Sequence, residues 1–134
     1  MQPEVKEWLD FAKMDLSSTR HLYETFYPRP LQIICYHCQQ AAEKALKAVI
    51  VAKGKPGGMP KMHDLEFLLS QMKNYTDIKE ELWDYAEALT PYGIEIRYPG
   101  GTEISDEQAE LGLKYADVLY SWAIEEIEKY NINI

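Results

Sequence analysis

Five residues of the sequence form a candidate anion-binding set: His37, Gln40, Lys44, Lys47 and Arg97. The first four lie in one run, residues 31–52, whose apolar residues recur at the spacing of an amphipathic helix. Steps of three and four residues place their side chains along one stripe of such a helix. An imidazole, an amide and two ammonium groups in a row suit phosphate oxygens or nucleobase edges, and the Arg97 guanidinium adds a forked donor. The sequence therefore predicts a ligand-binding site at these five residues.

A structural role explains much of the same stripe. Glu43 and Lys47 can form an i, i+4 pair on a solvated helix face, worth only ~0.3–0.5 kcal/mol. Gln40 and Glu43 can instead be buried and hold neighbouring helices together. Asp15 lies close to the inner face of the first helix and is expected to pair with a neighbouring helix, while Asp64 is expected to cap a short helix. Both interpretations of the stripe stay open at this point.

Cys35 and Cys38 stand three residues apart on the same predicted helix. A redox Cys-x-x-Cys pair normally lies at a helix N-terminus, and a structural zinc site needs two further ligands. These cysteines lie inside the helix among apolar residues, and the chain has no other cysteine. We therefore expect two small core residues, with no metal and no cofactor. The chain also lacks a glycine-rich phosphate loop in a helical context and the motif of a covalent nucleophile.

The charge of the chain is acidic overall but uneven. The formal net charge is −8 over 134 residues, which argues against nonspecific binding of nucleic acid. Residues 27–63, however, contain six basic side chains and one acidic side chain, a local balance of +5. This asymmetry fits either an anion-facing patch or lysines that share a solvated surface. No run of ~18 apolar residues is present, and the N-terminal stretch lacks the apolar core of a secretory signal, so we expect a cytoplasmic protein without a membrane span.

Helical periodicity accounts for almost the whole chain. Long amphipathic helices are expected from about residue 3 or 4 to about residue 25, at residues 31–52 and from Ser105 onward. Two short helices are expected between them, one capped by Asp64 and one after a turn and cap at residues 74–77. These elements predict a single domain, residues 1–134, of the all-α class: an antiparallel up-and-down helical bundle of four to five helices. Four aromatic residues exceed what so small a bundle can bury, which favours a homodimer: Trp83, Tyr85, Tyr115 and Trp122.

Three segments, in this order, resemble the HEPN family, the nucleotide-binding domain of higher eukaryotes and prokaryotes. The most specific is the run QQAAEKALKA at residues 39–48, which His37 precedes and His63-Asp64-Leu65 follows. Before it stands the pattern Trp8-x3-Ala12-x2-Asp15-Leu16, and after it Arg97-Tyr98-Pro99 precedes the final helix. The resemblance covers nearly the whole chain and is to the stand-alone prokaryotic type.

This resemblance implies an α-helical bundle that is usually dimeric. Stand-alone prokaryotic members often pair with a small nucleotidyltransferase encoded nearby, as its substrate-binding or regulatory partner or as the toxin of a toxin–antitoxin pair. Toxin members are metal-independent RNases with an arginine followed four to six residues later by a histidine. Here Arg97 is followed at those distances by Gly101, Thr102 and Glu103, and no histidine occurs after His63. The chain therefore resembles the non-catalytic Arg-Tyr-Pro branch, which favours a protein that is not an enzyme.

The sequence leads to one principal hypothesis and two alternatives. The principal hypothesis is a nucleotide-binding or regulatory partner of a small nucleotidyltransferase, dimeric and able to bind a nucleotide or RNA phosphate. The first alternative is a diverged RNase toxin, with Arg97 as the cation and His37 as the proton carrier. The second is a structural module that binds a protein partner through exposed aromatic residues.

Overall fold

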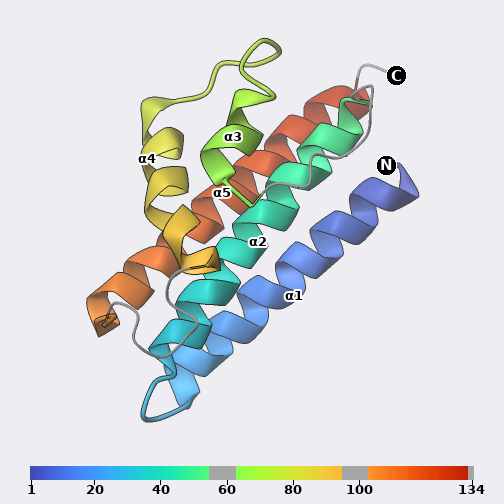
Figure 1. Cartoon of the computed structure of the whole chain (residues 1–134). Coiled ribbons are helices and arrows are strands. Elements are labelled where there is room, and N and C mark those ends of the chain that lie inside the picture. Colours follow the sequence, from blue (N-terminus) through green and yellow to red (C-terminus); the bar gives the residue numbers. More distant parts are fainter. Residues whose placement is uncertain (55–62, 95–102, 133–134) are drawn as a thin grey trace.

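A computed structural model describes residues 1–54, 63–94 and 103–132 of the chain. Within these ranges there is no strand, and the elements are α1 (Pro3–Thr25), α2 (Leu31–Ala52), α3 (Leu65–Ser70), α4 (Glu80–Leu89), the short 3₁₀ helix η1 (Thr90–Gly93) and α5 (Asp106–Ile132). Figure 1 shows that α1 and α4 run in the opposite direction to α2 and α5. The predicted all-α helical bundle is confirmed. None of the described helices is both long enough and apolar enough to cross a membrane.

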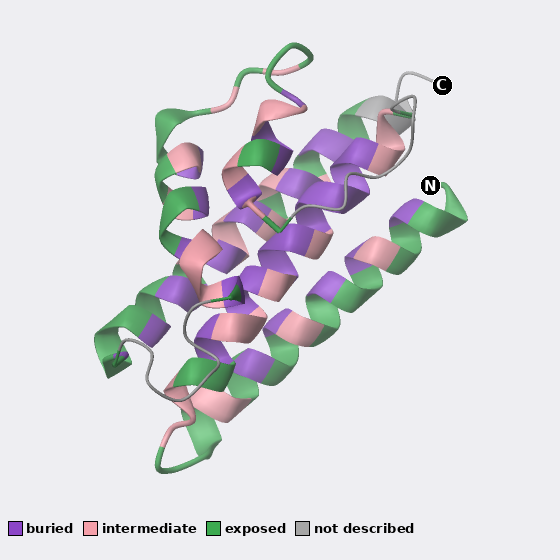
Figure 2. Ribbon diagram, in the orientation of Figure 1, coloured by how far each residue is buried: buried purple, intermediate pink, exposed green. Residues whose placement is uncertain are grey.

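Helix α2 is the centre of the bundle, because α1, α5 and η1 all pack on it. Thirteen of its 22 residues are buried, and Figure 2 shows that the burial continues along most of its length. Small side chains let neighbouring helices approach it closely: Ala41, Ala42, Ala45 and Ala48 are all fully buried. With neighbours on several sides, α2 has little surface left for solvent, so its polar residues must also find partners inside the bundle.

Capping motifs in the sequence define where α3 and α5 begin. The Asp64 carboxylate accepts hydrogen bonds from the backbone N–H groups of Glu66 and Phe67, at 2.9 and 3.2 Å, and so caps α3. A reciprocal capping box opens α5, since Gln108 N–H donates to Ser105 Oγ at 3.1 Å and Ser105 N–H donates to Gln108 Oε1 at 2.9 Å. The predicted cap at residues 74–77 is wrong. Residues 71–76 form a turn that follows α3, and α4 begins only at Glu80.

The four aromatic residues that suggested a dimer pack within the bundle. Tyr85 of α4 stacks on Tyr115 of α5, with ring centroids 4.3 Å apart, and both Trp83 and Trp122 are half-buried against the core. These side chains therefore give no reason to expect a dimer. Exposed apolar side chains lie elsewhere, and two of them are neighbours on α1: Phe11, 45% exposed, and Met14, 56% exposed.

Candidate functional site

Asp15 of α1 joins two of the predicted ligand residues on α2. Its Oδ2 atom lies 2.5 Å from Lys44 Nζ, and its Oδ1 atom lies 3.4 Å from His37 Nδ1. All three side chains remain partly open to solvent, with 15% of Asp15, 25% of Lys44 and 39% of His37 exposed. We call these three residues the Asp15 cluster. The carboxylate holds an ammonium and an imidazole side by side at the seam between α1 and α2.

A second group lies on the adjacent stripe of α2, and we call it the Glu43 cluster: Gln39, Glu43, Lys47 and His63. The Glu43 carboxylate lies 3.1 Å from Gln39 Nε2, 3.1 Å from Lys47 Nζ and 2.9 Å from His63 Nδ1. Burial by itself raises the pKa of the Glu43 carboxyl, but the three hydrogen bonds and the ammonium charge outweigh it and bring that pKa below its ordinary value. The carboxylate is therefore ionised at neutral pH. Because it can only accept, His63 presents Nδ1–H to it.

Gln39 is the buried centre of the Glu43 cluster, and the sequence did not identify it as a site residue. Its side chain is fully buried. Besides contacting Glu43, Nε2 donates to the backbone oxygen of His63 at 3.0 Å, and Oε1 accepts from Gln40 Nε2 at 2.8 Å. Gly93 of η1 packs directly on this amide, since a Cβ at position 93 would stand 2.7 Å from Gln39 Cδ. The sequence feature that could have identified Gln39 is its spacing, since Gln39, Glu43 and Lys47 follow one another at intervals of four residues along α2.

Lys47 lies in the interior rather than on a surface. Its side chain is only 9% exposed, and its ammonium lies 5.7 Å from the centroid of the Trp8 ring of α1. The Glu43–Lys47 pair therefore forms, but the interpretation that it sits on a solvated face is wrong. Gln40 is half-buried, and Arg97 lies outside the described residues. Among the predicted ligand residues in the described part of the chain, His37 and Lys44 are the two that lie together at a solvent-accessible position.

The basic segment at residues 27–63 does not form one open positive patch in the described part of the chain. Arg29 lies between two aromatic rings, with its guanidinium carbon 4.0 Å from the Tyr23 centroid and 4.7 Å from the Tyr27 centroid. It donates to the backbone oxygen of Tyr23 at 2.7 Å and to Asp106 Oδ1 at 3.3 Å. This arrangement joins the turn between α1 and α2 to the start of α5. Two further basic residues of the segment lie outside the described ranges: Lys55 and Lys61.

The two cysteines are buried, unbridged core residues. Burial raises the pKa of the Cys35 thiol to about 12 and also raises the pKa of Cys38. Both thiols are therefore protonated at neutral pH and chemically inert in the folded protein. Among the residues that the structure describes, no three His, Cys, Asp or Glu side chains are grouped so that they could hold a metal ion.

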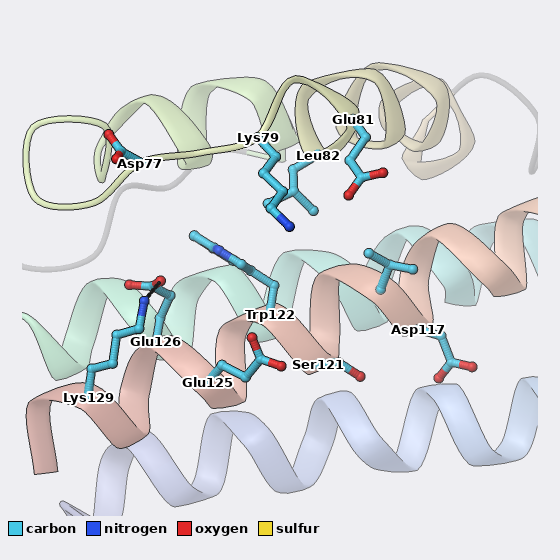
Figure 3. A pocket seen from close by; sticks show the side chains of 11 residues that line it. Asp77, Lys79, Glu81, Leu82, Asp117, Ser121, Trp122, Glu125, Glu126 and Lys129 are labelled. Carbon is cyan, nitrogen blue, oxygen red and sulfur yellow. Dashed lines mark hydrogen bonds and ion pairs between the residues drawn. The ribbon is translucent and has the colours of Figure 1, made fainter. Parts of the chain in front are cut away.

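A long groove runs between α4 and α5, lined by none of the five predicted ligand residues. Its volume is about 540 Å³. Figure 3 shows Trp122 reaching from α5 toward α4, while Glu81 of α4 and Lys79, the residue before α4, reach toward α5. Carboxylates outnumber ammonium groups in its lining, by Asp77, Glu81, Asp117, Glu125 and Glu126 against Lys79 and Lys129. No pattern in the sequence indicated this groove, because its two walls are far apart along the chain.

Comparison with known proteins matches residues 5–127 to the HEPN domain family. Among solved structures, TT1696 from Thermus thermophilus is similar with a TM-score of 0.78 and 26% identity, over 93% of this chain and 99% of that one. ST0689, an archaeal HEPN homologue, has a TM-score of 0.71 and 20% identity, over 95% and 99%. A HEPN domain protein from Thermotoga maritima has a TM-score of 0.54 and 25% identity, over 93% and 94%. No curated protein matches the chain.

Proposed function

Because this chain belongs to the HEPN domain family, we propose that it is a non-catalytic, nucleotide-binding or regulatory partner of a small nucleotidyltransferase. The sequence supports a non-catalytic role, since no histidine follows Arg97 at the spacing that RNase members of the family require. The Asp15 cluster supports phosphate binding. It carries the proposal because it is the place where two donors from the predicted stripe stand together and open to solvent.

The chemistry of the Asp15 cluster suits one phosphate group. The Lys44 ammonium has three donors, and Asp15 engages it through a single oxygen. The His37 imidazole faces the same carboxylate through Nδ1 and has a second nitrogen, Nε2. When His37 is protonated the cluster carries a balance of +1, and when it is neutral the balance is zero. Asp15 thus orients the two donors and also competes with an incoming anion, which predicts weak binding.

Calorimetric titration of the purified protein with ATP, and separately with inorganic phosphate, tests the binding proposal. We expect Lys44→Met to weaken ATP binding by about tenfold and Asp15→Asn to strengthen it, because the competing carboxylate is removed. Lys114→Met is the matched control, since Lys114 is an exposed lysine on α5. If Lys44→Met and Lys114→Met bind ATP equally well, the Asp15 cluster is not the site.

The protein partner requires a separate experiment. Co-expression with the nucleotidyltransferase encoded nearby, followed by size-exclusion chromatography, should yield one complex that elutes earlier than either protein. Separate elution of the two proteins at micromolar concentration would contradict a stable partnership.

We also propose that the chain forms a homodimer through the outer face of α1. Phe11 and Met14 are exposed neighbours there, and Phe11 lines a surface hollow of about 230 Å³ together with Trp8. An exposed apolar patch of this kind is typical of an interface. In sedimentation equilibrium, Phe11→Asp should shift the wild-type dimer to monomer, whereas Ile33→Asp, a change at a similarly exposed residue of α2, should not. A monomeric wild-type protein would contradict the proposal.

A second candidate function, an RNase with a diverged site, has one observation in its favour. Two histidines lie beside a carboxylate, His37 next to Asp15 and His63 next to Glu43, and a carboxylate that orients an imidazole supports proton transfer. Purified protein incubated with RNA tests this candidate. Cleavage that is lost in both His37→Ala and Arg97→Ala would support it, and intact RNA after prolonged incubation would exclude it.

A further inference from the structure

The groove between α4 and α5 has a size and a lining that none of the proposals above uses. Its apolar lining consists of Trp122 and Val118 from α5 and Leu82 from α4. Five carboxylates and two ammonium groups line the groove, and because Asp117 pairs with Arg20 outside it, the remaining balance is −2. Phosphate groups are repelled by such a lining, so the groove is not an extension of the Asp15 cluster. It is suited to a positively charged group that also has a flat or apolar part.

The charges of the groove are not all neutralised within the protein. Glu126 is only 2% exposed and accepts hydrogen bonds from Thr76 Oγ1 at 3.1 Å and from Lys129 Nζ at 2.9 Å. Among the described residues, by contrast, Asp77 and Glu81 take part in no hydrogen bond or ion pair. Figure 3 shows the Glu81 carboxylate directed toward the space above α5. A cation that enters the groove therefore meets at least two carboxylates, Asp77 and Glu81, and it binds them without breaking an ion pair within the protein.

The length of the groove indicates the kind of occupant. Its α5 wall extends from Asp117 to Lys129, which corresponds to about 18 Å at the rise of an α-helix. A single free amino acid or metal ion would occupy a small part of this length. A segment of polypeptide with two or three basic side chains matches both the length and the charge.

We propose that the α4–α5 groove is a docking site for an arginine-bearing segment of a partner protein, whose guanidinium groups contact the Trp122 ring and the carboxylates of Glu81 and Glu125. Arginine fits better than lysine because its planar guanidinium both stacks on an indole and donates in a fork to carboxylates. The inference rests on the proposed function only in that the chain works with a protein partner. It does not depend on nucleotide binding.

A peptide titration tests the docking site without the partner protein. The probe is an acetylated and amidated hexa-arginine peptide, and the readout is its affinity for the purified full-length chain by calorimetry. We expect Glu81→Gln/Glu125→Gln to lower the affinity by about threefold to tenfold. The matched control is Glu87→Gln/Glu107→Gln, which removes the same number of charges from exposed positions of α4 and α5 that do not line the groove. Both variants bring the net charge from −8 to −6, and unchanged circular dichroism shows that each is folded.

The possible outcomes are distinguishable. A loss confined to the Glu81/Glu125 variant supports the groove, and hexalysine binding several-fold weaker than hexa-arginine supports the stacked guanidinium. Equal losses in the two variants, or no binding at all, would overturn the proposal, because the attraction would then be diffuse. Spermidine that binds as tightly as the peptide would also overturn it, since the site would then recognise a small polyamine. The nucleotidyltransferase complex can form through another face in any of these cases, so the two proposals fail independently.

Discussion

Replacing Glu43 by glutamine tests whether the Glu43 cluster stabilises the bundle. The change keeps the shape of the side chain but removes its charge, so the Lys47 ammonium loses its carboxylate partner while its side chain is only 9% exposed. Breaking a buried ion pair from one side costs ~3–5 kcal/mol. Because Lys47 keeps the Trp8 ring at 5.7 Å and a little solvent, we expect the lower end, a loss of about 3 kcal/mol in the free energy of unfolding.

The opposite change should cost less, because the two partners are not equivalent. In Lys47→Met the carboxylate still accepts from Gln39 and His63, so we expect a loss of about 1–2 kcal/mol. The double variant Glu43→Leu/Lys47→Met should lie within about 1 kcal/mol of wild type, since a buried ion pair can be exchanged for apolar groups at little cost. In that variant Gln39 Nε2 retains its bond to the His63 backbone oxygen at 3.0 Å.

The pH dependence gives a second measurement on the same residue. The pKa of Glu43 is lowered in the folded protein from its ordinary 4.5. Its contribution to stability is therefore fully present above pH 4.5 and is lost as the pH falls through the folded value. Glu43→Gln has no such contribution to lose, so the difference between wild type and Glu43→Gln should shrink below pH 4.5.

Urea unfolding followed by circular dichroism measures all of these effects. The control is Asp10→Asn, which breaks the Lys6–Asp10 pair: it has the same four-residue spacing and a 2.7 Å contact, but its side chains are 68% and 56% exposed. That change should cost no more than ~0.5 kcal/mol. The reasoning is refuted if Glu43→Gln costs as little as Asp10→Asn, or if its cost is the same at every pH.

Three further predictions concern packing around α2. Gly93→Ala should destabilise the protein by about 1–3 kcal/mol because its Cβ would displace the Gln39 amide. Gly112→Ala should stabilise it by about 0.5–1 kcal/mol, since Gly112 lies inside α5 and a Cβ there would lie at an ordinary contact distance, 3.7 Å, from Cys38 Sγ of α2. Thermal unfolding separates the two. Arg29→Lys should lower the urea midpoint of unfolding through lost stacking and hydrogen bonds, and Arg20→Lys, at a surface pair with Asp117, should lower it less; equal decreases would contradict this. The two buried thiols should not react with a disulfide reagent at neutral pH until the protein unfolds, and rapid labelling of the native protein would show that they are accessible.

Features that depend on neighbouring residues in the chain were predictable. The apolar spacing predicted α1 and α2 close to their observed bounds, Pro3–Thr25 and Leu31–Ala52. Short polar motifs predicted the starts of α3 and α5, because a cap is completed within three residues. The start of α4 was missed where a turn after α3 used the same residue types as a cap.

The environment of each stripe of α2 was not predictable, because it is decided by residues distant in the sequence. A helical period shows that Gln39, Glu43 and Lys47 share a stripe, but not whether that stripe is covered. It is covered because Trp8 of α1 and His63 before α3 both reach it. The neighbouring stripe, with His37 and Lys44, meets Asp15 and stays partly open.

Carboxylates that are distant in the sequence also reduce the positive charge that residues 27–63 present in the folded protein. Counting residues 27–63 as a segment gives +5, yet three of its cations meet carboxylates in the folded protein: Arg29 with Asp106, Lys44 with Asp15 and Lys47 with Glu43. Two of those carboxylates come from outside the segment. The attraction for a phosphate at the Asp15 cluster therefore depends on Asp15, which neutralises the positive charge, as much as on Lys44, which supplies it. For this reason Asp15→Asn is the most informative variant in the nucleotide titration: it should raise the affinity if Lys44 binds the phosphate, and it should only lower stability if the cluster merely joins α1 to α2.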